Sequence, residues 1–581
     1  MSRFGTPDGG SAVAPLPHAP RPDAPPGLFA RLVRDPNAIW MREMRQSARL
    51  GRTPWVLFAL TLSISLLMCS IGGLAAADRT SPAQLGGALF QVFFSIAYIV
   101  VVIVGPAVAA NSIASEREGK TWEAVLLTGL APKEIARGKF MAAYTTIALY
   151  IVVLAPVGAL SFLFGGVTAV EVIVAFVFLF LVAGLAVAFG LAVSSLMSSL
   201  RGAIVVTLML AICVGPFLYS VFGFGASFAI HKVWNEVPEG FPIWLPLAYS
   251  RAGFGIDYVL VLGVLPLLLV IVPAWFLYET TISNLTGDAD DKSTGLKRWF
   301  AVCTPLLAVA CAMPSLLSDS DSDRLGFAIV GLVAFFLHIC FSTMLFTYEP
   351  PGPSRRVRIH WQRTGAPALR RFFGPGLTKT SVLVMLLGVL GMAGIAVSTM
   401  AALEALGSSS DKQEKILQIF LFAAYATPFF VFIVGFNGWL RARGNSPWIA
   451  RLISGGVLFL IAAGPWVVAA IGGVLAKTDE KDWLIVGSPS PFYVFVMMGA
   501  VDKYATEHVL TIPAGLACAT GWGALGLALL AASSRRCTRV VMQHDAAVAQ
   551  AEAALDAEEA ARRAAAQPPP PHPGATTPQA T

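Results

Sequence analysis

The chain has 581 residues, of which 56% are hydrophobic and 13% are charged, with a formal net charge of +7 and a mean hydropathy of +0.70. A soluble globular chain carries roughly 25% charged residues and about 45–50% apolar ones. This composition excludes a wholly soluble protein, and it excludes disorder over most of the length because disordered chains are poor in apolar residues.

Twelve long runs with few or no charges follow one another along the chain, and each predicts a membrane-spanning helix because a span needs ~20 apolar residues. They lie at 55–77, 88–110, 139–165, 171–194, 203–225, 257–278, 299–317, 325–347, 380–402, 416–438, 452–475 and 508–532. The run at 299–317 is the shortest and contains two prolines. We therefore predict an all-α polytopic membrane protein, with an amphipathic interfacial helix before the first span.

The connections between these runs differ in charge. Counted over residues 31–539, with the segments before the first run and after the last included, those on the side of the N-terminus hold 28 Lys and Arg residues, and those on the opposite side hold 9. Cytoplasmic connections of multi-pass proteins carry the excess of Lys and Arg. We predict that both termini are cytoplasmic. The high Ala content and the excess of Arg over Lys favour a bacterial protein, and hence the inner membrane.

Composition divides the chain into four parts. Residues 1–27 are rich in Pro, Ala and Gly, which predicts a disordered tail, and the long polar lead before the first span argues against a cleaved signal peptide. Residues 28–285 contain the basic lead and six spans, and residues 286–534 contain six more. The Ala/Glu/Pro-rich part 535–581 predicts a cytoplasmic tail with a solvated helix over 545–566.

The chain offers little that could perform chemistry. Its seven cysteines and seven histidines are dispersed, without a CxxC pair or metal-ligand spacing, so we predict no catalytic residues and no metal site. Gly119-Lys120-Thr121 resembles the end of a phosphate-binding loop. The upstream glycine is missing, because position 114 is Ala, and a membrane helix rather than a strand precedes it. No nucleotide site is predicted.

The segment 111–139 directly follows the second run and holds the most informative pattern. Ser115 and Glu118 fit a capping box, with Ser115 as the N-cap of a new helix. Glu116 and Lys120 stand four residues apart and can pair along one face of that helix.

An apolar stripe and two helix signals complete this segment. Trp122, Val125 and Leu126 recur at helical spacing, which predicts one apolar face. Gly129 is suited to a helix end, and Pro132 to the first turn of the next helix. We predict a short pair of helices at the membrane surface. A solvated loop that only connects two spans is the alternative.

The same segment resembles the signature of the ABC transporter type-2 permease family. That pattern contains E-R-E, a small and a basic residue, T-x-E, aliphatic residues and Thr, and later I-x-x-G-K. The matching positions are Glu116, Arg117, Glu118, Gly119, Lys120, Thr121, Glu123, Leu126, Leu127, Thr128, Ile135, Gly138 and Lys139. In such permeases the helices after the second span contact the ATPase subunit and receive its motion.

The resemblance implies a separate ABC ATPase subunit as partner, which binds the ATP-Mg, while this chain binds no cofactor and no nucleic acid. The residues implied in ATPase-subunit docking are Glu116, Arg117, Glu118, Lys120, Thr121, Trp122, Glu123, Leu126 and Leu127. An apolar side chain such as Trp122 or Leu126 would fill a cleft on the partner, and the surrounding charges would fix its position.

A second match lies in the basic, amphipathic stretch 28–54. Residues 37–45 resemble the family's N-P-x-x-x-K/R-E-x-R opening, although Pro36 precedes Asn37 in this chain. The resemblance implies an interfacial helix in contact with membrane lipids. Its characteristic residues are Trp40, Arg42, Glu43 and Arg45. An ordinary juxtamembrane cluster of positive charge is the alternative.

The resemblance covers residues 30–285. In the second half a basic stretch, Arg355 to Lys379, precedes the ninth span, and residues 437–456 follow the tenth without E-R-E or T-x-E. This half is either a degenerate repeat of the first or a set of added helices. In the second case the chain would pair with another permease subunit or with a second copy of itself.

Charged residues are almost absent from the twelve runs, whereas ion-coupled transporters need them at bilayer depth. We therefore expect the permease subunit of an ABC transporter, an exporter driven by a separate ATPase and not itself an enzyme, with a lipid-like or amphipathic cargo. The alternatives are an ion-coupled secondary transporter and a polytopic lipid-processing enzyme.

Overall fold

The computed structural model describes residues 36–49, 52–77, 81–234, 245–318, 320–407, 410–476, 483–501 and 510–566. Every regular element in these ranges is helical. Eleven of the helices are long and apolar enough to cross a membrane. The predicted fold class, an all-α polytopic membrane protein, is confirmed. The predicted tail 1–27 lies outside the described residues.

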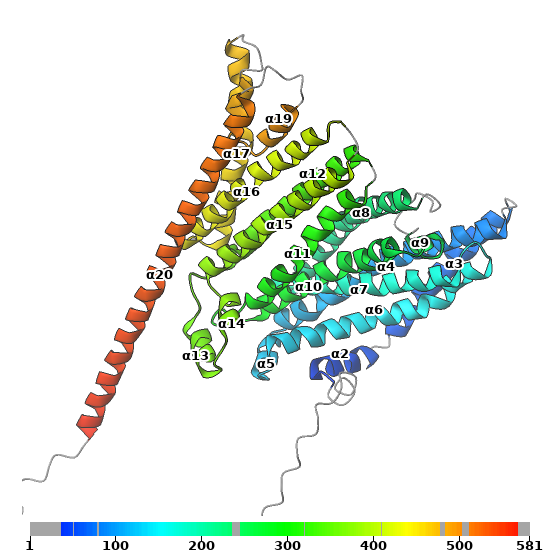
Figure 1. Cartoon of the computed structure of the whole chain (residues 1–581). Helices are drawn as coiled ribbons and strands as arrows, with labels where there is room; N and C mark the ends of the chain where they lie inside the picture. Colours follow the sequence, from blue (N-terminus) through cyan, green and yellow to red (C-terminus); the bar gives the residue numbers. More distant parts are fainter. Residues whose placement is uncertain are drawn as a thin grey trace, which may run out of the picture.

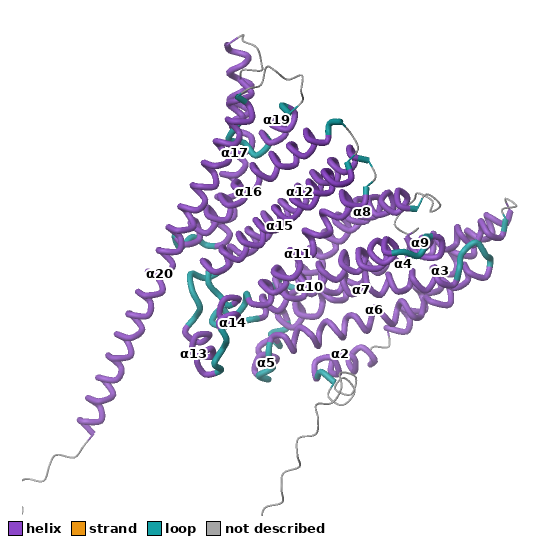
Figure 2. Tube along the Cα trace, in the orientation of Figure 1, coloured by secondary structure: helices purple, strands orange, loops and turns teal. Residues whose placement is uncertain are grey.

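The first half contains long helices joined by short connections (Figure 1). In chain order they are α2 (Ala38–Arg49), α3 (Arg52–Ala77), α4 (Pro82–Glu118), α5 (Trp122–Leu127), α6 (Pro132–Leu163), α7 (Ala169–Leu196), α8 (Leu200–Val233), α9 (Leu245–Arg251), the π-helix η2 (Tyr258–Val264) and α10 (Leu265–Leu285). The short helices α2, α5 and α9 lie outside the long ones, at the ends of the bundle (Figure 2).

The second half continues in the same manner, with two short helices between α12 and α15. Its elements are α11 (Thr294–Leu317), α12 (Asp321–Leu345), η3 (Phe346–Tyr348), α13 (Arg355–Arg363), α14 (Ala368–Phe373), α15 (Leu377–Leu406), α16 (Lys412–Ala442), α17 (Pro447–Ala476), η4 (Leu484–Gly487), α19 (Tyr493–Gly499) and α20 (Thr511–Ala566).

The predicted spans fall on helices, with one difference in extent. The fifth run, 203–225, lies within α8, a helix of 34 residues. The last run, 508–532, and the predicted solvated helix over 545–566 belong to one continuous helix, α20, of 56 residues. At 1.5 Å per residue this helix is far longer than a bilayer core. It extends well beyond the other helices (Figure 1).

Local sequence explains where two of the long helices begin. Ser81 caps α4 and exchanges hydrogen bonds with Gln84, with Pro82 in the first turn. Thr168 caps α7 and exchanges hydrogen bonds with Glu171 in the same way. These capping boxes satisfy backbone N–H groups that have no partner within the helix.

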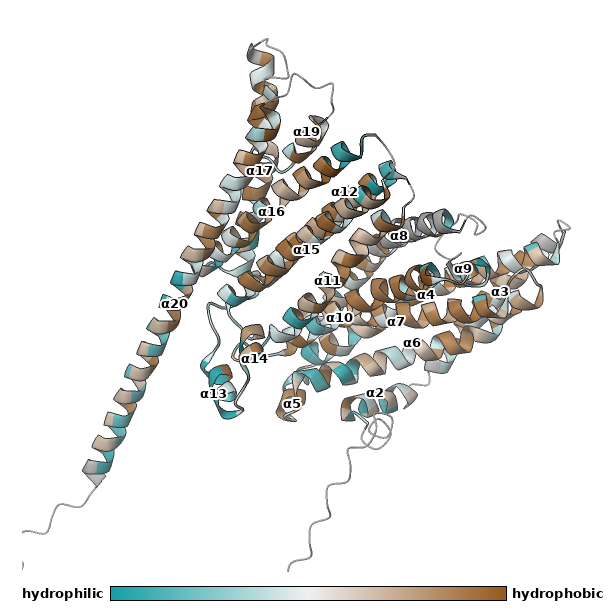
Figure 3. Ribbon diagram, viewed as in Figure 1, coloured by the Kyte–Doolittle hydropathy of each residue, from teal (hydrophilic) through white to brown (hydrophobic). Residues whose placement is uncertain are grey.

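The helices α2, α5, α13 and α14 lie at one end of the bundle, which we call the α5 end, and α9 and α19 lie at the other (Figure 1). Hydrophilic residues are concentrated on α13 and on the neighbouring end of the bundle beside α14 (Figure 3). The long helices between the two ends are largely hydrophobic, as helices in contact with lipid must be.

Each half has its own hydrophobic core. In the first half α4 packs closely on α7, where a Cβ atom at Gly190 would lie 2.7 Å from Pro106 Cα. In the second half α16 packs closely on α20, where a Cβ atom at Gly526 would lie 2.6 Å from Phe432 Cα. Glycine at these crossings allows the close backbone approach that holds helices together in lipid.

Candidate functional site

The helix α4 passes through the position where a new helix was predicted to begin. Ser115 lies inside α4, and its hydroxyl donates to the carbonyl of Asn111, so the predicted N-cap is wrong. The helix instead ends at Glu118, and Lys120 takes a left-handed conformation with φ of 56°. The predicted pairing of Glu116 with Lys120 is also wrong, because the Glu116 carboxylate binds other cations.

The short helix α5 follows this turn and projects from the bundle. Val125 is buried in the first core, and Trp122 packs beside it with the Arg117 guanidinium 5.6 Å from its ring centre. Leu126 and Leu127 point away from the core and are 47% and 87% exposed. The predicted apolar stripe is therefore divided between packed and exposed side chains.

The predicted end of this elbow is confirmed. Gly129 has φ of 72°, in the left-handed region that glycine adopts without strain, and Pro132 occupies the first turn of α6. The connection between α4 and α6 is thus an ordered elbow with one short helix. The second helix of the predicted pair is the beginning of the long helix α6.

A network of four charges fixes the base of the elbow. Lys139 on α6 is fully buried, and its Nζ lies 2.8 Å from Glu43 Oε1 and 3.0 Å from Glu116 Oε2. Arg42 on α2 forms an ion pair with Glu116 as well, and Lys139 also donates to the Ser112 carbonyl at 2.9 Å. The charges of Arg42 and Lys139 therefore balance those of Glu43 and Glu116, and the buried Lys139 has the partners that a buried charge requires.

The helix α2 is attached to α6 by Asn37 in addition. Its side-chain oxygen accepts from the Ile39 and Trp40 amides at 3.0 and 3.3 Å, and its Nδ2 donates to the Glu134 carbonyl at 2.8 Å. A Cβ atom at Gly138 would lie 2.8 Å from Ile39 Cβ, so only glycine permits this approach. Asn37 thus caps α2 and joins it to α6.

Of the interfacial residues expected from the sequence, the structure joins Arg42 and Glu43 to the charge network. Trp40 is half-buried and Arg45 is exposed. The importance of Asn37 was missed, although it is the first residue of the matched tract 37–45 and precedes a helix, where Asn is a favoured cap.

The two other charged residues of the E-R-E sequence, Arg117 and Glu118, bind the backbone at the end of α7 and at the start of α8. The Arg117 Nη1 donates to the Ser195 carbonyl at 2.7 Å and the Met197 carbonyl at 3.2 Å, where α7 ends. The Glu118 Oε2 accepts from the Leu200 amide at 2.6 Å, where α8 begins. Each satisfies backbone groups without a partner in their own helix, and each charge has the sign that the helix dipole favours.

The nine residues implied in docking therefore divide into two groups. Glu116, Arg117 and Glu118 bind elements of this chain, and Trp122 is half-buried. The other five are exposed to solvent and form what we call the α5 tip: Lys120, Thr121, Glu123, Leu126 and Leu127.

The second half contains a comparable buried pair that the sequence analysis did not identify. Lys297 Nζ lies 3.1 Å from Glu349 Oε1 and donates to the Gly374 carbonyl at 2.7 Å. The other Glu349 oxygen accepts from the Gly376 amide at 2.9 Å. The sequence does hold a signal for this pair: Lys297 lies in the first turn of a membrane-spanning helix, where a charge needs a partner.

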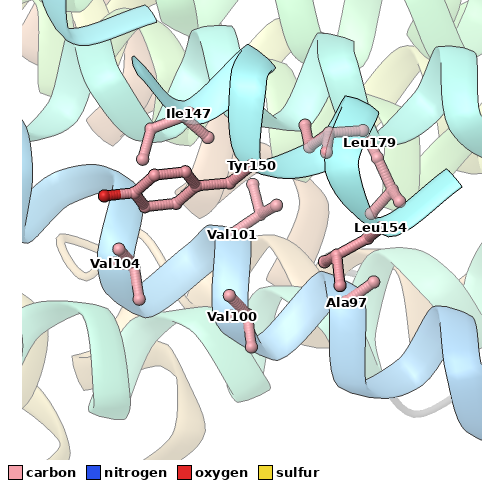
Figure 4. Close-up of a pocket in the computed structure, with 9 residues that line it drawn as sticks. Ala97, Val100, Val101, Val104, Ile147, Tyr150, Leu154 and Leu179 are labelled. Carbon is pink, nitrogen blue, oxygen red and sulfur yellow. The ribbon is translucent and has the colours of Figure 1, made fainter. Parts of the chain in front are cut away.

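A small apolar cavity lies between α4, α6 and α7 in the first half (Figure 4). It is lined by Ala97, Val100, Val101, Val104, Ile147, Tyr150, Ile151, Leu154 and Leu179. These side chains carry no charge, and the Tyr150 hydroxyl is their only polar group. Within the described ranges, no group of three or more His, Cys, Asp or Glu residues could hold a metal ion.

No model of a known protein family matches the chain, and no curated protein matches it.

Proposed function

We propose that the chain is the membrane-spanning permease subunit of an ABC transporter. In this proposal the transporter is an exporter, and a separate ATPase subunit, which binds ATP-Mg, docks on the α5 tip. The chain has no enzymatic activity of its own. The observation that carries the proposal is that α5 ends in an exposed apolar side chain, with Leu127 87% exposed. The end of α4 that precedes it is held by charged contacts, because the E-R-E residues bind α2, α6, α7 and α8.

The physical reason is the transmission of force. A partner that moves α5 also moves α4, because only the three hydrogen-bonded residues 119–121 lie between the two helices. From α4 the displacement reaches α2 and α6 through Glu116, and the α7–α8 connection through Arg117 and Glu118. Chains of packed side chains and hydrogen bonds carry such coupling. A loop without these contacts would bend instead.

The orientation belongs to the same proposal. The α5 end, which holds the basic connections, would face the cytoplasm of a bacterium, with the bundle in the inner membrane. An ATPase subunit could then reach the α5 tip. The largely apolar bundle favours a lipid-like or amphipathic cargo.

The test is co-purification of the full-length chain with candidate ABC ATPase subunits of the source cell. Leu127→Glu places a charge on the apolar tip without touching an internal contact, and we expect it to lower the captured ATPase at least about tenfold. Leu163→Glu is the matched control, because Leu163 is an exposed leucine at the opposite end of α6. It should leave capture unchanged.

Three results would contradict the proposal. Equal capture by the Leu127 variant and the wild type would remove the docking role of the α5 tip. Transport by the purified chain under a sodium or pH gradient, without an ATPase, would identify a secondary transporter. Hydrolysis or group transfer on lipid by the purified chain would identify an enzyme.

A further inference from the structure

The segment that joins α12 to α15 is strongly basic. Residues 354–379 contain no Asp or Glu. They contain seven permanent cations, Arg355, Arg356, Arg358, Arg363, Arg370, Arg371 and Lys379. The segment forms α13 and α14 at the α5 end, between two helices of membrane-spanning length (Figure 1).

The segment is folded against the bundle rather than hanging from it. Trp361 is buried, with its ring on Gly374 and the Lys379 ammonium 5.9 Å from the ring centre. Lys297 binds the Gly374 carbonyl, and the Leu377 amide donates to the Pro350 carbonyl at 2.8 Å. The backbone that carries the arginines is therefore held in place before any ligand arrives.

Three of the arginines, all on α13, are neutralised within the chain. Arg358 binds Asp545 through two hydrogen bonds of 2.5 and 2.6 Å, which raise the pKa of the Arg358 guanidinium above its ordinary value. Arg355 pairs with Glu552. Arg356 Nε lies 3.2 Å from Asp290. These contacts hold α13 between α20 and the connection from α10 to α11.

The remaining arginines face solvent without a carboxylate. In the part of the chain that the structure describes, Arg363 and Arg370 have no ion-pair or hydrogen-bond partner, and both are exposed. Arg371 is exposed too, and its Nε donates to the Ala366 carbonyl at 2.9 Å, which leaves its other N–H groups available.

An exposed apolar side chain directly precedes two of these cations on α14. Leu369 is 70% exposed, next to Arg370 on α14. Phe372 and Phe373, one turn further on, pack against the second core. The exposed side chains of this short helix thus include a leucine and two arginines, at the point where α15 enters the bundle.

We propose that Arg363, Arg370 and Arg371 form a binding site for the phosphate of an anionic phospholipid, with Leu369 in contact with the lipid chains. Guanidinium groups bind phosphate through paired hydrogen bonds, and basic clusters beside a spanning helix attract anionic lipid. An acidic protein surface would complement the three charges, but it would leave Leu369 without an apolar environment. The site does not depend on the proposed transport function.

The test is native mass spectrometry of the full-length chain in detergent, with equal amounts of phosphatidylglycerol and phosphatidylcholine of identical chains. We expect phosphatidylglycerol to be retained preferentially. The variant R363Q/R370Q/R371Q should lower this retention at least about tenfold. The matched control is R535Q/R536Q/R539Q, which removes three exposed arginines of α20 and should retain the lipid like the wild type. Equal melting temperatures would show that both variants are folded.

Two further measurements separate a lipid site from a plain anion site. Inorganic phosphate in excess should not displace phosphatidylglycerol. Leu369→Gln, which leaves every charge in place, should lower retention about two- to fivefold. The proposal is overturned if both lipids are retained equally, if R535Q/R536Q/R539Q loses as much lipid as R363Q/R370Q/R371Q, or if free phosphate displaces the lipid completely.

Discussion

The connections after α4 and after α16 both turn the chain from one long helix into the next, but they differ in structure. Each follows a long helix that packs on a later helix through glycine, and each turns at a left-handed residue, Lys120 with φ of 56° and Gly444 with φ of 89°. After Lys120 the chain forms α5, and the next span begins only at Pro132. After Gly444 the next long helix begins at Pro447.

In both places an arginine binds the free carbonyl groups at the end of another helix. Arg117 binds the carbonyls at the end of α7, and Arg451 binds those at the end of α12, with Nε 3.0 Å from Met344 O and Nη2 3.2 Å from Leu345 O. After Gly444, however, no short helix precedes the next long one. The comparison shows that fixing helix ends does not require an elbow, so the exposed leucines of α5 need a separate explanation, and docking of a partner is the one we propose.

The buried lysines of the two halves differ in how completely they are sealed. Lys297 and Glu349 are almost inaccessible, with Glu349 2% exposed. Lys139 is equally buried, but Glu43 is 22% exposed and Glu116 has a second cation in Arg42. If the lysine is removed, water can solvate the carboxylate that remains at Glu43 in the first half, but it can hardly reach Glu349 in the second.

The largest effect is expected from Lys297→Met. Removing the lysine leaves Glu349 as an uncompensated buried charge, which costs about 3–5 kcal/mol. Thermal unfolding in detergent should show a marked fall in melting temperature, partly restored by Glu349→Gln in the same chain. Lys292→Met, which removes an exposed pair with Asp288, is the control and should cost less than about 1 kcal/mol. Equal falls for both would refute the comparison.

A smaller effect is expected from Lys139→Met, about 2–3 kcal/mol, because Arg42 still pairs with Glu116. The loss should act locally by releasing α2 from α6. Limited trypsin digestion should therefore cleave faster after Arg45 and Arg49, while cleavage in α13 stays at the wild-type rate. If the sites in α2 and α13 are exposed together, the network stabilises the whole fold rather than the attachment of α2.

Glu118→Gln should cost about 1 kcal/mol, because the carboxylate that accepts from the first amide of α8 loses its charge. Glu123→Gln is the control on the exposed α5 tip and should leave stability unchanged. Differential scanning of the two purified variants gives the comparison directly. A fall in melting temperature for Glu123→Gln of the same size would show that the effect does not come from the α8 contact.

The smallest effects concern the two left-handed turns. Lys120→Gly should stabilise the chain by about 0.5–1 kcal/mol, because glycine adopts the conformation without strain. Gly444→Ala should destabilise it by about 1 kcal/mol for the same reason. Melting temperatures should shift in opposite directions. Shifts of the same sign would mean that packing, not backbone conformation, decides these positions.

The sequence by itself determined the approximate place of the spans, the elbow after α4 and its closing signals at Gly129 and Pro132. These follow from local physical chemistry: the transfer of about 20 apolar residues into lipid, and the backbone preferences of glycine and proline. The capping pattern at Ser115 gave a wrong helix start, because the local pattern is not sufficient there. Its hydroxyl binds a carbonyl one turn back within a helix that has already formed, and the pattern does not encode whether a helix precedes it.

Only the tertiary structure decided the partners of the charges. Glu116 meets a lysine 23 residues further on and an arginine 74 residues before it, while Arg117 meets the end of α7, about 80 residues away. Such pairs depend on how long helices pack and where each one ends, so spacing along the chain does not specify them. The same packing buries part of the matched motif and leaves Leu126 and Leu127 exposed, which is why the two groups of residues became distinct only in three dimensions.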